Sequence, residues 1–409
     1  MTLVEPAPDN DRKSVLPWLA SVVMAAMLLA CVKGTDTLRL TPVGWLLPLG
    51  ASLLILILSA TRVHWRFFLP WAPWCLFLFI QALSSPHANA LVRCILMVTP
   101  LVVGLAASAF AVSVEALETL RRALVVVSIA FLLIFFTRFL FGPAEERLFF
   151  PAESISALLL GSLFLVRFLI DRHWASGALW AAVSLVPVLT VSRAATAAAV
   201  LTAPLALAPL PLKRRVCLAV ALAVAGFAVF STASFQQKMF FSGSGQLTDI
   251  LDQGANLQMS GRSVLWLTLL QGVPDSPWFG HGANASEALL LDVAGLSHPH
   301  NDYLRILYEF GVLGLVLFGV AVGGTIFALL RLETPLPQFR WWKYALASSF
   351  VPYLLIMFTD NVLLYAAFFG NLQFALIGFY VAAMRNRPAF TAVVMMRAGN
   401  DLRSGAIVA

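Results

Sequence analysis

Charged residues are scarce in this sequence of 409 residues, because Asp, Glu, Lys and Arg together make up only 11% of it. Soluble domains usually carry about 25% of these residues. Hydrophobic residues reach 60%, and apolar runs long enough to cross a bilayer recur from end to end. The composition therefore excludes a water-soluble globule and predicts one all-α polytopic membrane domain.

Cysteine is also rare, and its placement excludes two common uses of the residue. The sequence has four cysteines, each inside an apolar run, with no C-x-x-C pair and no histidine at ligand spacing beside them: Cys31, Cys75, Cys94 and Cys217. This pattern argues against both a disulfide framework and a zinc site. We expect neither a metal nor any other cofactor.

Twelve apolar segments predict membrane-spanning helices joined mostly by short connections. The segments are residues 15–32, 43–60, 67–83, 91–112, 123–141, 155–170, 176–191, 193–211, 216–232, 305–330, 344–363 and 365–384. The one long connection, residues 233–304, separates the ninth segment from the tenth and is a candidate carrier of function. Within it, residues 264–270 predict a short helix lying on the membrane.

The basic residues predict the orientation of these helices. With the N-terminus in the cytoplasm, about two thirds of the 27 lysines and arginines lie on the inner side, as the positive-inside rule requires. The net charge of +7 is thus a membrane signature and does not predict a nucleic-acid partner. We expect an inner tail (1–14), helices one to nine (15–232), an outer loop with short helices (233–304), helices ten to twelve (305–384) and an inner tail (385–409).

No acidic residue lies in the middle of a predicted span, and we find no internal repeat, which argues against an ion-coupled transporter. Polar residues gather instead at the outer boundary, in the stretches 191–193, 260–262 and 297–305. Each stretch lies where an apolar helix is predicted to begin. The outer boundary is therefore the place to look for a site.

Two of these stretches place an arginine in the first turn of a predicted helix, with Ser192 before Arg193 and Ser260 before Arg262 as candidate N-caps. A helix N-terminus attracts anions, and a guanidinium binds phosphate oxygens in a bidentate manner. Two such helix ends suit a diphosphate. The alternative for each arginine alone is a side chain that reaches the lipid headgroups.

In the third stretch, a helix is predicted to begin at His300, with Gly311 and Gly314 on the same stripe. We expect these glycines to let a neighbouring helix approach beneath His300. We also expect the positive helix end to keep the imidazole neutral, so that it can act as a general base. The alternative is a histidine that is bonded to Asn301 or to the backbone and only marks the boundary.

Other polar residues near the outer boundary are weaker candidates. The residues His281, Asp302 and Arg305 are expected to be structural or solvated. Possible supporting residues, including external charges that could steer a substrate, are Asn301, His298, Tyr303, Arg147, Lys33 and Arg39.

Together these motifs resemble the O-antigen ligase (WaaL) branch of the O-antigen ligase and polymerase superfamily. The hallmark of that family is matched by His300, Asn301, nine further residues, Gly311 and Gly314. The Ser-Arg pair at 192–193 also resembles the family's motifs, as do Ser-Gly-Arg-Ser-Val-Leu-Trp and Pro-Trp-Phe-Gly-His-Gly within 260–282.

The resemblance implies a GT-C-like, inverting and metal-independent glycosyltransferase of the bacterial inner membrane, with its active site facing the periplasm. It implies transfer of O-antigen polysaccharide from undecaprenyl diphosphate to the lipid A core oligosaccharide during lipopolysaccharide biosynthesis. In that activity His300 would be the base, and Arg193 and Arg262 would bind the diphosphate. The alternatives are a surface polysaccharide polymerase, and then a lipid transporter or flippase.

Overall fold

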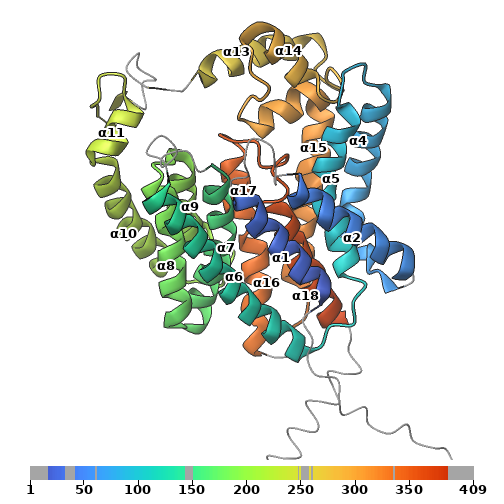
Figure 1. Ribbon diagram of the computed structural model, residues 1–409, viewed down its shortest axis with the longest axis vertical. Helices are drawn as coiled ribbons and strands as arrows, with labels where there is room; N and C mark the ends of the chain where they lie inside the picture. Colours follow the sequence, from blue (N-terminus) through green and yellow to red (C-terminus); the bar gives the residue numbers. More distant parts are fainter. Residues whose placement is uncertain are drawn as a thin grey trace, which may run out of the picture.

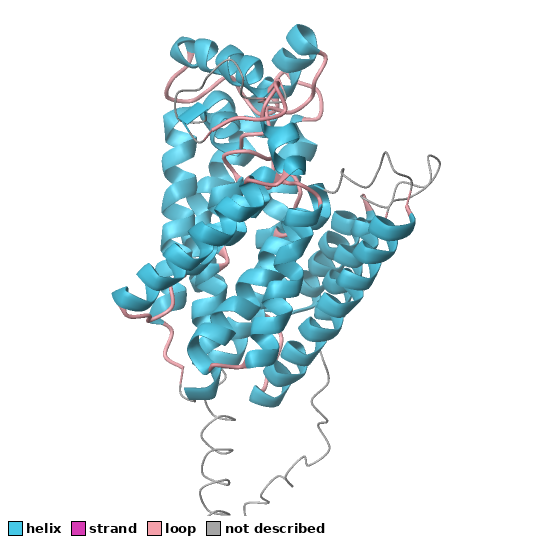
Figure 2. Ribbon diagram, turned by 90° about the vertical axis from the view of Figure 1, so that its left-hand side faces the viewer, coloured by secondary structure: helices cyan, strands magenta, loops and turns pink. Residues whose placement is uncertain are grey.

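The computed structural model describes residues 17–32, 42–59, 62–142, 151–246, 248–249, 258, 261–334 and 337–385. These residues form helices and loops and contain no strand (Figure 2). Apolar runs explain the helices, because a helix satisfies its own backbone hydrogen bonds where water is absent. The expected all-α membrane fold agrees with this architecture.

The helices pack side by side, with the short helices Arg262–Gly272 and Ala285–Ala294 above them (Figure 1). In chain order they are α1 (Trp18–Cys31), α2 (Val43–Ser59), α3 (Trp65–Phe68), η2 (Leu69–Trp71), α4 (Ala72–Ser84), α5 (Ala90–Ala107), α6 (Val114–Phe141), α7 (Pro151–Asp171), α8 (Trp174–Leu189), α9 (Arg193–Leu205), α10 (Leu212–Phe230), α11 (Ala233–Met239), α13 (Arg262–Gly272), η4 (Val273–Asp275), α14 (Ala285–Ala294), α15 (Asp302–Arg331), η5 (Pro337–Phe339), α16 (Arg340–Ser348), α17 (Phe350–Ile356) and α18 (Gly370–Arg385).

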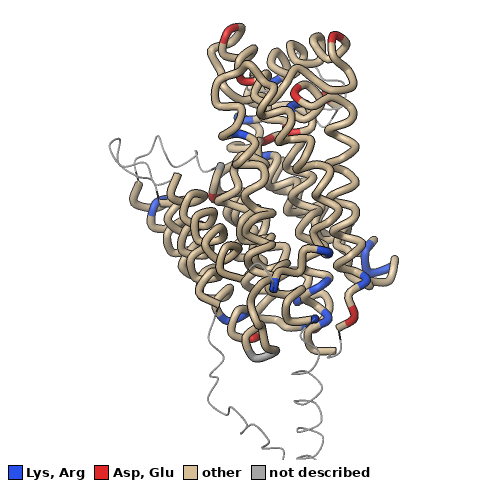
Figure 3. Tube along the Cα trace, turned by 90° about the vertical axis from the view of Figure 1, so that its right-hand side faces the viewer, with Lys and Arg blue, Asp and Glu red and all other residues tan. Residues whose placement is uncertain are grey.

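Several of these helices have the length and composition of membrane spans, so the chain is a multi-pass membrane protein. Five described segments are long and apolar enough to cross, and α10 with α11 would make a sixth if this pair, bent by 79°, counts as one span. Every predicted segment contains at least part of a helix, while the number of twelve crossings stays a prediction. Most charged residues lie toward the two ends of the bundle (Figure 3).

The protein core is built around α18, in which every residue from Gly370 to Met384 is buried. Helix α5 packs closely along it, because a side chain at Gly378 would collide with the backbone at Gly104. Small residues allow helices to approach in this way in membranes. Helix α7 forms a second buried element, against α8, α9 and α16.

The structure differs from the predicted eleventh and twelfth spans near their junction. Helix α17 ends at Ile356, and residues 357–369 form turns before α18 begins at Gly370. Buried polar groups hold this segment in place, because the Asp302 carboxylate accepts from the Leu363 N–H at 2.8 Å and the Asp302 N–H donates to the Met357 carbonyl at 2.8 Å. We call residues 357–369 the irregular segment.

Helix α15 is broken at Gly311, where φ is 65° and ψ is −169°, a conformation available almost only to glycine. The break frees the carbonyls of Tyr308 and Glu309 and the N–H groups of Val312 and Leu313 from their helical partners. The sequence predicted a continuous helix through Gly311, with His300, Gly311 and Gly314 on one face, and that prediction is wrong.

The loop 277–282 fills the break with four backbone hydrogen bonds. The His281 and Gly282 N–H groups donate to Tyr308 and Glu309 at 2.9 and 3.0 Å. The Pro277 and Trp278 carbonyls accept from Val312 and Leu313 at 2.8 and 3.1 Å. The Pro-Trp-Phe-Gly-His-Gly motif is therefore the partner of the broken helix.

The two glycines of the family hallmark have different neighbours from those predicted. A side chain at Gly311 would collide with the backbone of Trp278 and Phe279, so a loop and not a helix approaches there. At Gly314, an added Cβ would meet Phe310 of the same helix and lie 3.4 Å from Phe77 of α4. The predicted close helix approach is thus limited to Gly314.

Candidate functional site

His300 lies in the turn before α15 and not on the helix itself. Helix α15 begins at Asp302, and Asn301 is its N-cap, accepting the Leu304 N–H at 3.0 Å. His300 has a φ of 51°, so the prediction that a helix begins there is wrong. The expected positive helix end therefore acts on Asn301 and Asp302 more directly than on the imidazole.

The imidazole of His300 contacts the irregular segment through its Nδ1 atom. Nδ1 lies 3.4 Å from Oδ1 of Asp360 and 3.2 Å from Nδ2 of Asn361. The side chain is 38% exposed, and its Nε2 atom makes no hydrogen bond with the described residues. The imidazole is thus held at Nδ1 and open at Nε2.

Both predicted arginines occupy the first position of a helix, as expected. Arg193 begins α9, where it donates to the Gln258 carbonyl at 2.8 Å, and Arg262 begins α13. Ser192 is at the N-cap of α9 without a side-chain cap bond. Gly261 is the N-cap of α13, and the prediction for Ser260 falls on a residue outside those described.

A third cation, Lys238 at the end of α11, joins the two arginines. Burial, with the charges of Arg193 and Arg262, lowers the pKa of Lys238. Burial also lowers the pKa of Arg262, while the Asp360 carboxylate acts in the opposite direction. The structure therefore brings three half-buried cations together, and Arg262 among them interacts with the Asp360 carboxylate that contacts His300. This excess of positive charge suits an anion.

The supporting candidates separate into structural and peripheral residues. The Tyr303 hydroxyl donates to the Leu354 carbonyl at 2.9 Å, and its ring packs on Phe358. Burial and the charges of Arg305 and Arg93 lower the pKa of His298 to about 4, so this side chain stays neutral. The predictions for Lys33, Arg39 and Arg147 fall on residues outside those described.

Sequence reasoning missed Asp360, Asn361 and Lys238. Asp360 and Asn361 are two adjacent polar residues in the long apolar run after Lys343, and that interruption was the available signal. Lys238 carried no comparable signal, because it lies in the predicted outer loop 233–304, where charged residues are expected. Only the folded chain places it beside Arg193.

An apolar cavity of about 390 Å³ begins at Arg193. Arg193 is one of the three cations Arg193, Lys238 and Arg262, which we call the cation cluster. The cavity lies between α9 and α10 and is lined almost entirely by apolar side chains, with Arg193, Phe235 and Met239 at the end nearest the cation cluster. Helix α10 has no buried residue, so one wall of this cavity is a helix that faces outward. The cavity is thus a hydrophobic groove with a cationic side chain, Arg193, at one end.

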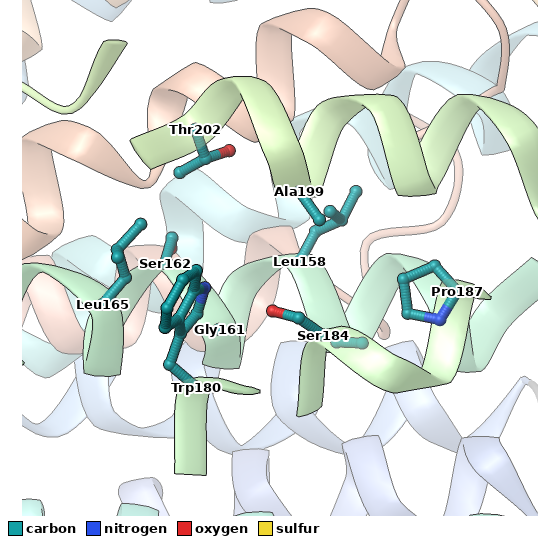
Figure 4. Close-up of a pocket in the computed structure, with 10 residues that line it drawn as sticks. Leu158, Gly161, Ser162, Leu165, Trp180, Ser184, Pro187, Ala199 and Thr202 are labelled. Atoms are coloured by element: carbon teal, nitrogen blue, oxygen red, sulfur yellow. The ribbon is translucent and has the colours of Figure 1, made fainter. Parts of the chain in front are cut away.

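A second cavity lies deeper between α7, α8 and α9 (Figure 4). Its walls include Ser162, Ser184, Thr202 and Trp180, and its volume of about 10 Å³ has room for about one water molecule. It is too small for a substrate. In the described part of the chain, no three His, Cys, Asp or Glu side chains are grouped to hold a metal ion.

Comparison with known families supports the same region. Residues 177–319 match the family model described as O-antigen ligase. The match contains Arg193, Arg262, His300, the loop 277–282 and Gly311. No curated protein matches the chain. The resemblance seen in the motifs is thus confirmed for an O-antigen ligase domain at residues 177–319.

Proposed function

Starting from the O-antigen ligase domain that this membrane protein carries, we propose that it is an inverting glycosyltransferase of the bacterial inner membrane. It transfers O-antigen from undecaprenyl diphosphate to the lipid A core oligosaccharide, with its site facing the periplasm. The observation that carries the proposal is the position of the cation cluster of Arg193, Lys238 and Arg262. Arg193 of this cluster lines the apolar cavity, and Arg262 interacts with the Asp360 carboxylate that contacts His300.

The cluster supplies the charge that a diphosphate needs. The guanidinium groups of Arg193 and Arg262 are only partly hydrated, so an anion placed between them replaces little water and reduces their mutual repulsion. The charge that develops on the leaving diphosphate is then stabilised by fixed cations. Side chains would take the role that a divalent cation has in other glycosyltransferases.

The apolar cavity supplies a place for the first part of the polyprenyl tail. Arg193 lines the cavity and also belongs to the cation cluster. A lipid diphosphate bound there would have its diphosphate at the cations and its polyprenyl tail against the apolar walls. The opposite assignment, with a sugar in the cavity, would bury hydroxyl groups against apolar walls without partners. The chemistry of the walls favours the lipid.

His300 would act on the acceptor sugar. The acceptor hydroxyl oxygen attacks the anomeric carbon from the side opposite the diphosphate, a C–O bond forms, and the bond to the diphosphate breaks with its electron pair. The hydroxyl proton passes to Nε2 of His300. Asp360 beside Nδ1 would stabilise the imidazolium that results.

Transfer with purified components tests this proposal. The protein, in detergent with a chelator, is incubated with an undecaprenyl-diphosphate-linked glycan and lipid A carrying its core, and the products are separated on a gel. We expect the core to gain the glycan at the same rate with and without the chelator. Elongation of the lipid-linked glycan while the core is ignored would identify a polymerase, and reaction of neither would contradict glycosyl transfer.

We expect Arg193→Ala and Arg262→Ala each to weaken binding of undecaprenyl diphosphate by about 10- to 100-fold, because each removes charge-assisted hydrogen bonds of about 1.5–3 kcal/mol. Lysine at either position should restore only part of this affinity, because the bidentate fork is lost. Calorimetric titration in detergent measures the effect.

The matched control is Arg122→Ala, which removes an arginine whose side chain is 73% exposed on α6. It should leave the affinity unchanged. Wild-type affinity in both alanine variants, or in both lysine variants, would contradict diphosphate binding by this pair.

A further inference from the structure

The two partners of His300 make opposite demands on its Nδ1 atom. The Nδ2 atom of Asn361 is a donor at 3.2 Å, so Nδ1 must be unprotonated to accept from it. The Oδ1 atom of Asp360 is an acceptor at 3.4 Å, so Nδ1 must carry a proton to bond with it. A neutral imidazole satisfies one demand or the other, and the choice decides whether Nε2 is a donor or a base.

The orientation of Asn361 is set by Arg305. The Nη2 atom of Arg305 lies 3.1 Å from Oδ1 of Asn361, and a guanidinium has donors only. The amide oxygen must therefore point to Arg305, which leaves the amide nitrogen pointing to His300. A rotated amide would place two donors together on one side and would lose the bond to the arginine.

Arg305 is itself held in position. It is 3% exposed on α15, and Asp302 and Glu309 lie three residues before and four residues after it, on the same face of the helix. Asp302 also bonds to Leu363 of the irregular segment at 2.8 Å. The helix that carries Arg305 and the segment that carries Asn361 are thus fastened to each other.

Asp360 is less well placed to take the Nδ1 proton in this arrangement. Its Oδ1 atom already accepts the backbone N–H of Asn361 at 2.8 Å. The distance from Nδ1 of His300 to Asp360, 3.4 Å, is also longer than the distance to Asn361, 3.2 Å. The geometry favours the tautomer in which Nδ1 accepts from Asn361. In that tautomer the proton is on Nε2, where a base must be unprotonated.

We propose that Asn361, oriented by Arg305, holds His300 with its proton on Nε2 when no substrate is bound, and that His300 becomes a base when Nδ1 donates to Asp360 instead. The proposal rests on the proposed function of His300. The change moves one proton from Nε2 to Nδ1 by exchange with water and leaves the net charge unaltered. Arg305 and Asn361 are positioning residues in this scheme, and in the resting tautomer His300 cannot accept a proton at Nε2.

Several charged or titratable groups lie around His300 and can influence where its proton resides. They come from the turn before α15, from α15 itself and from the irregular segment: His298, Asp302, Arg305 and Asp360. Arg262 of α13 acts on Asp360, and Arg193 of α9 and Lys238 of α11 act in turn on the same group of cations. Of the two histidines, His298 is kept neutral by burial and by Arg305. The NMR signals of the His300 ring can be assigned by their loss in His300→Gln.

Nitrogen NMR of protein labelled on histidine tests the proposal directly, because the two ring nitrogens have different shifts when protonated and unprotonated. In the wild-type protein without substrate, at a pH where the imidazole carries a single proton, we expect that proton on Nε2 of His300. A proton on Nδ1 would overturn the proposal. The measurement needs no activity, so it is independent of whether His300 is the base.

Asn361→Asp provides the second test, because it replaces the donor by an acceptor while keeping a partner for Arg305. We expect the proton to move to Nδ1 and the acidic limb of the transfer rate to shift to higher pH, since a second carboxylate stabilises the protonated imidazole. Asn89→Asp adds the same charge in the turn before α5 and should change neither. An unchanged tautomer in Asn361→Asp would overturn the role of Asn361.

Discussion

Replacing His300 by alanine should lower the transfer rate by about 10²- to 10⁴-fold, which is the usual contribution of a positioned general base. The affinity for undecaprenyl diphosphate should stay within about twofold of wild type, because the cation cluster does not include His300. Turnover of purified protein at saturating donor, together with titration of the donor, separates these two effects.

His87→Ala is the matched control, since His87 lies in the turn between α4 and α5. It should retain the wild-type rate. Normal turnover by His300→Ala would remove His300 from the mechanism. A simultaneous loss of donor binding and of thermal stability would instead indicate a structural role for this histidine.

Gly311→Ala should destabilise the protein by at least about 3 kcal/mol. Two effects act together at this position, because φ is 65° with ψ at −169° and because the new Cβ would collide with the backbone of Trp278 and Phe279. The four hydrogen bonds between loop 277–282 and α15 would have to separate to make room. We expect little or no monodisperse protein from size-exclusion chromatography, and a lower Tm for any that is recovered.

Gly319→Ala is the control on the same helix, since no other atom lies within 4 Å of a Cβ built there. Alanine has the higher helix propensity, so this variant should match or slightly exceed the wild-type Tm. Equal yields and equal Tm values for Gly311→Ala and Gly319→Ala would show that the break at Gly311 is not required for folding.

Most helices were predictable because their apolar runs are long and bounded by polar residues. The irregular segment was not, because residues such as Val362, Leu363 and Leu364 are as apolar as those of a spanning helix. Its turns are stabilised by tertiary bonds, including the one from Leu363 to Asp302. Bonds between segments so far apart leave no local pattern in the sequence.

For the site, the sequence predicted Arg193 and Arg262 at helix starts because arginine and an apolar run mark such positions at a membrane boundary. It placed the start of α15 two residues early, although Asn301 is a favoured N-cap residue and was the available signal. The partners of His300 could not be found in this way. Asp360 and Asn361 reach it only through the packing of the irregular segment.

The irregular segment also determines when the site can exist. Arg193, Lys238 and Arg262 are synthesised well before Asp360 and Asn361, so a nascent chain contains its cations while the imidazole still lacks both partners. Insertion of α18 then completes the protein core and the surroundings of His300 in one step. Under the proposed function, chains that end before the irregular segment would bind lipid diphosphates without transferring the glycan, and transfer activity would require that the irregular segment has packed against His300.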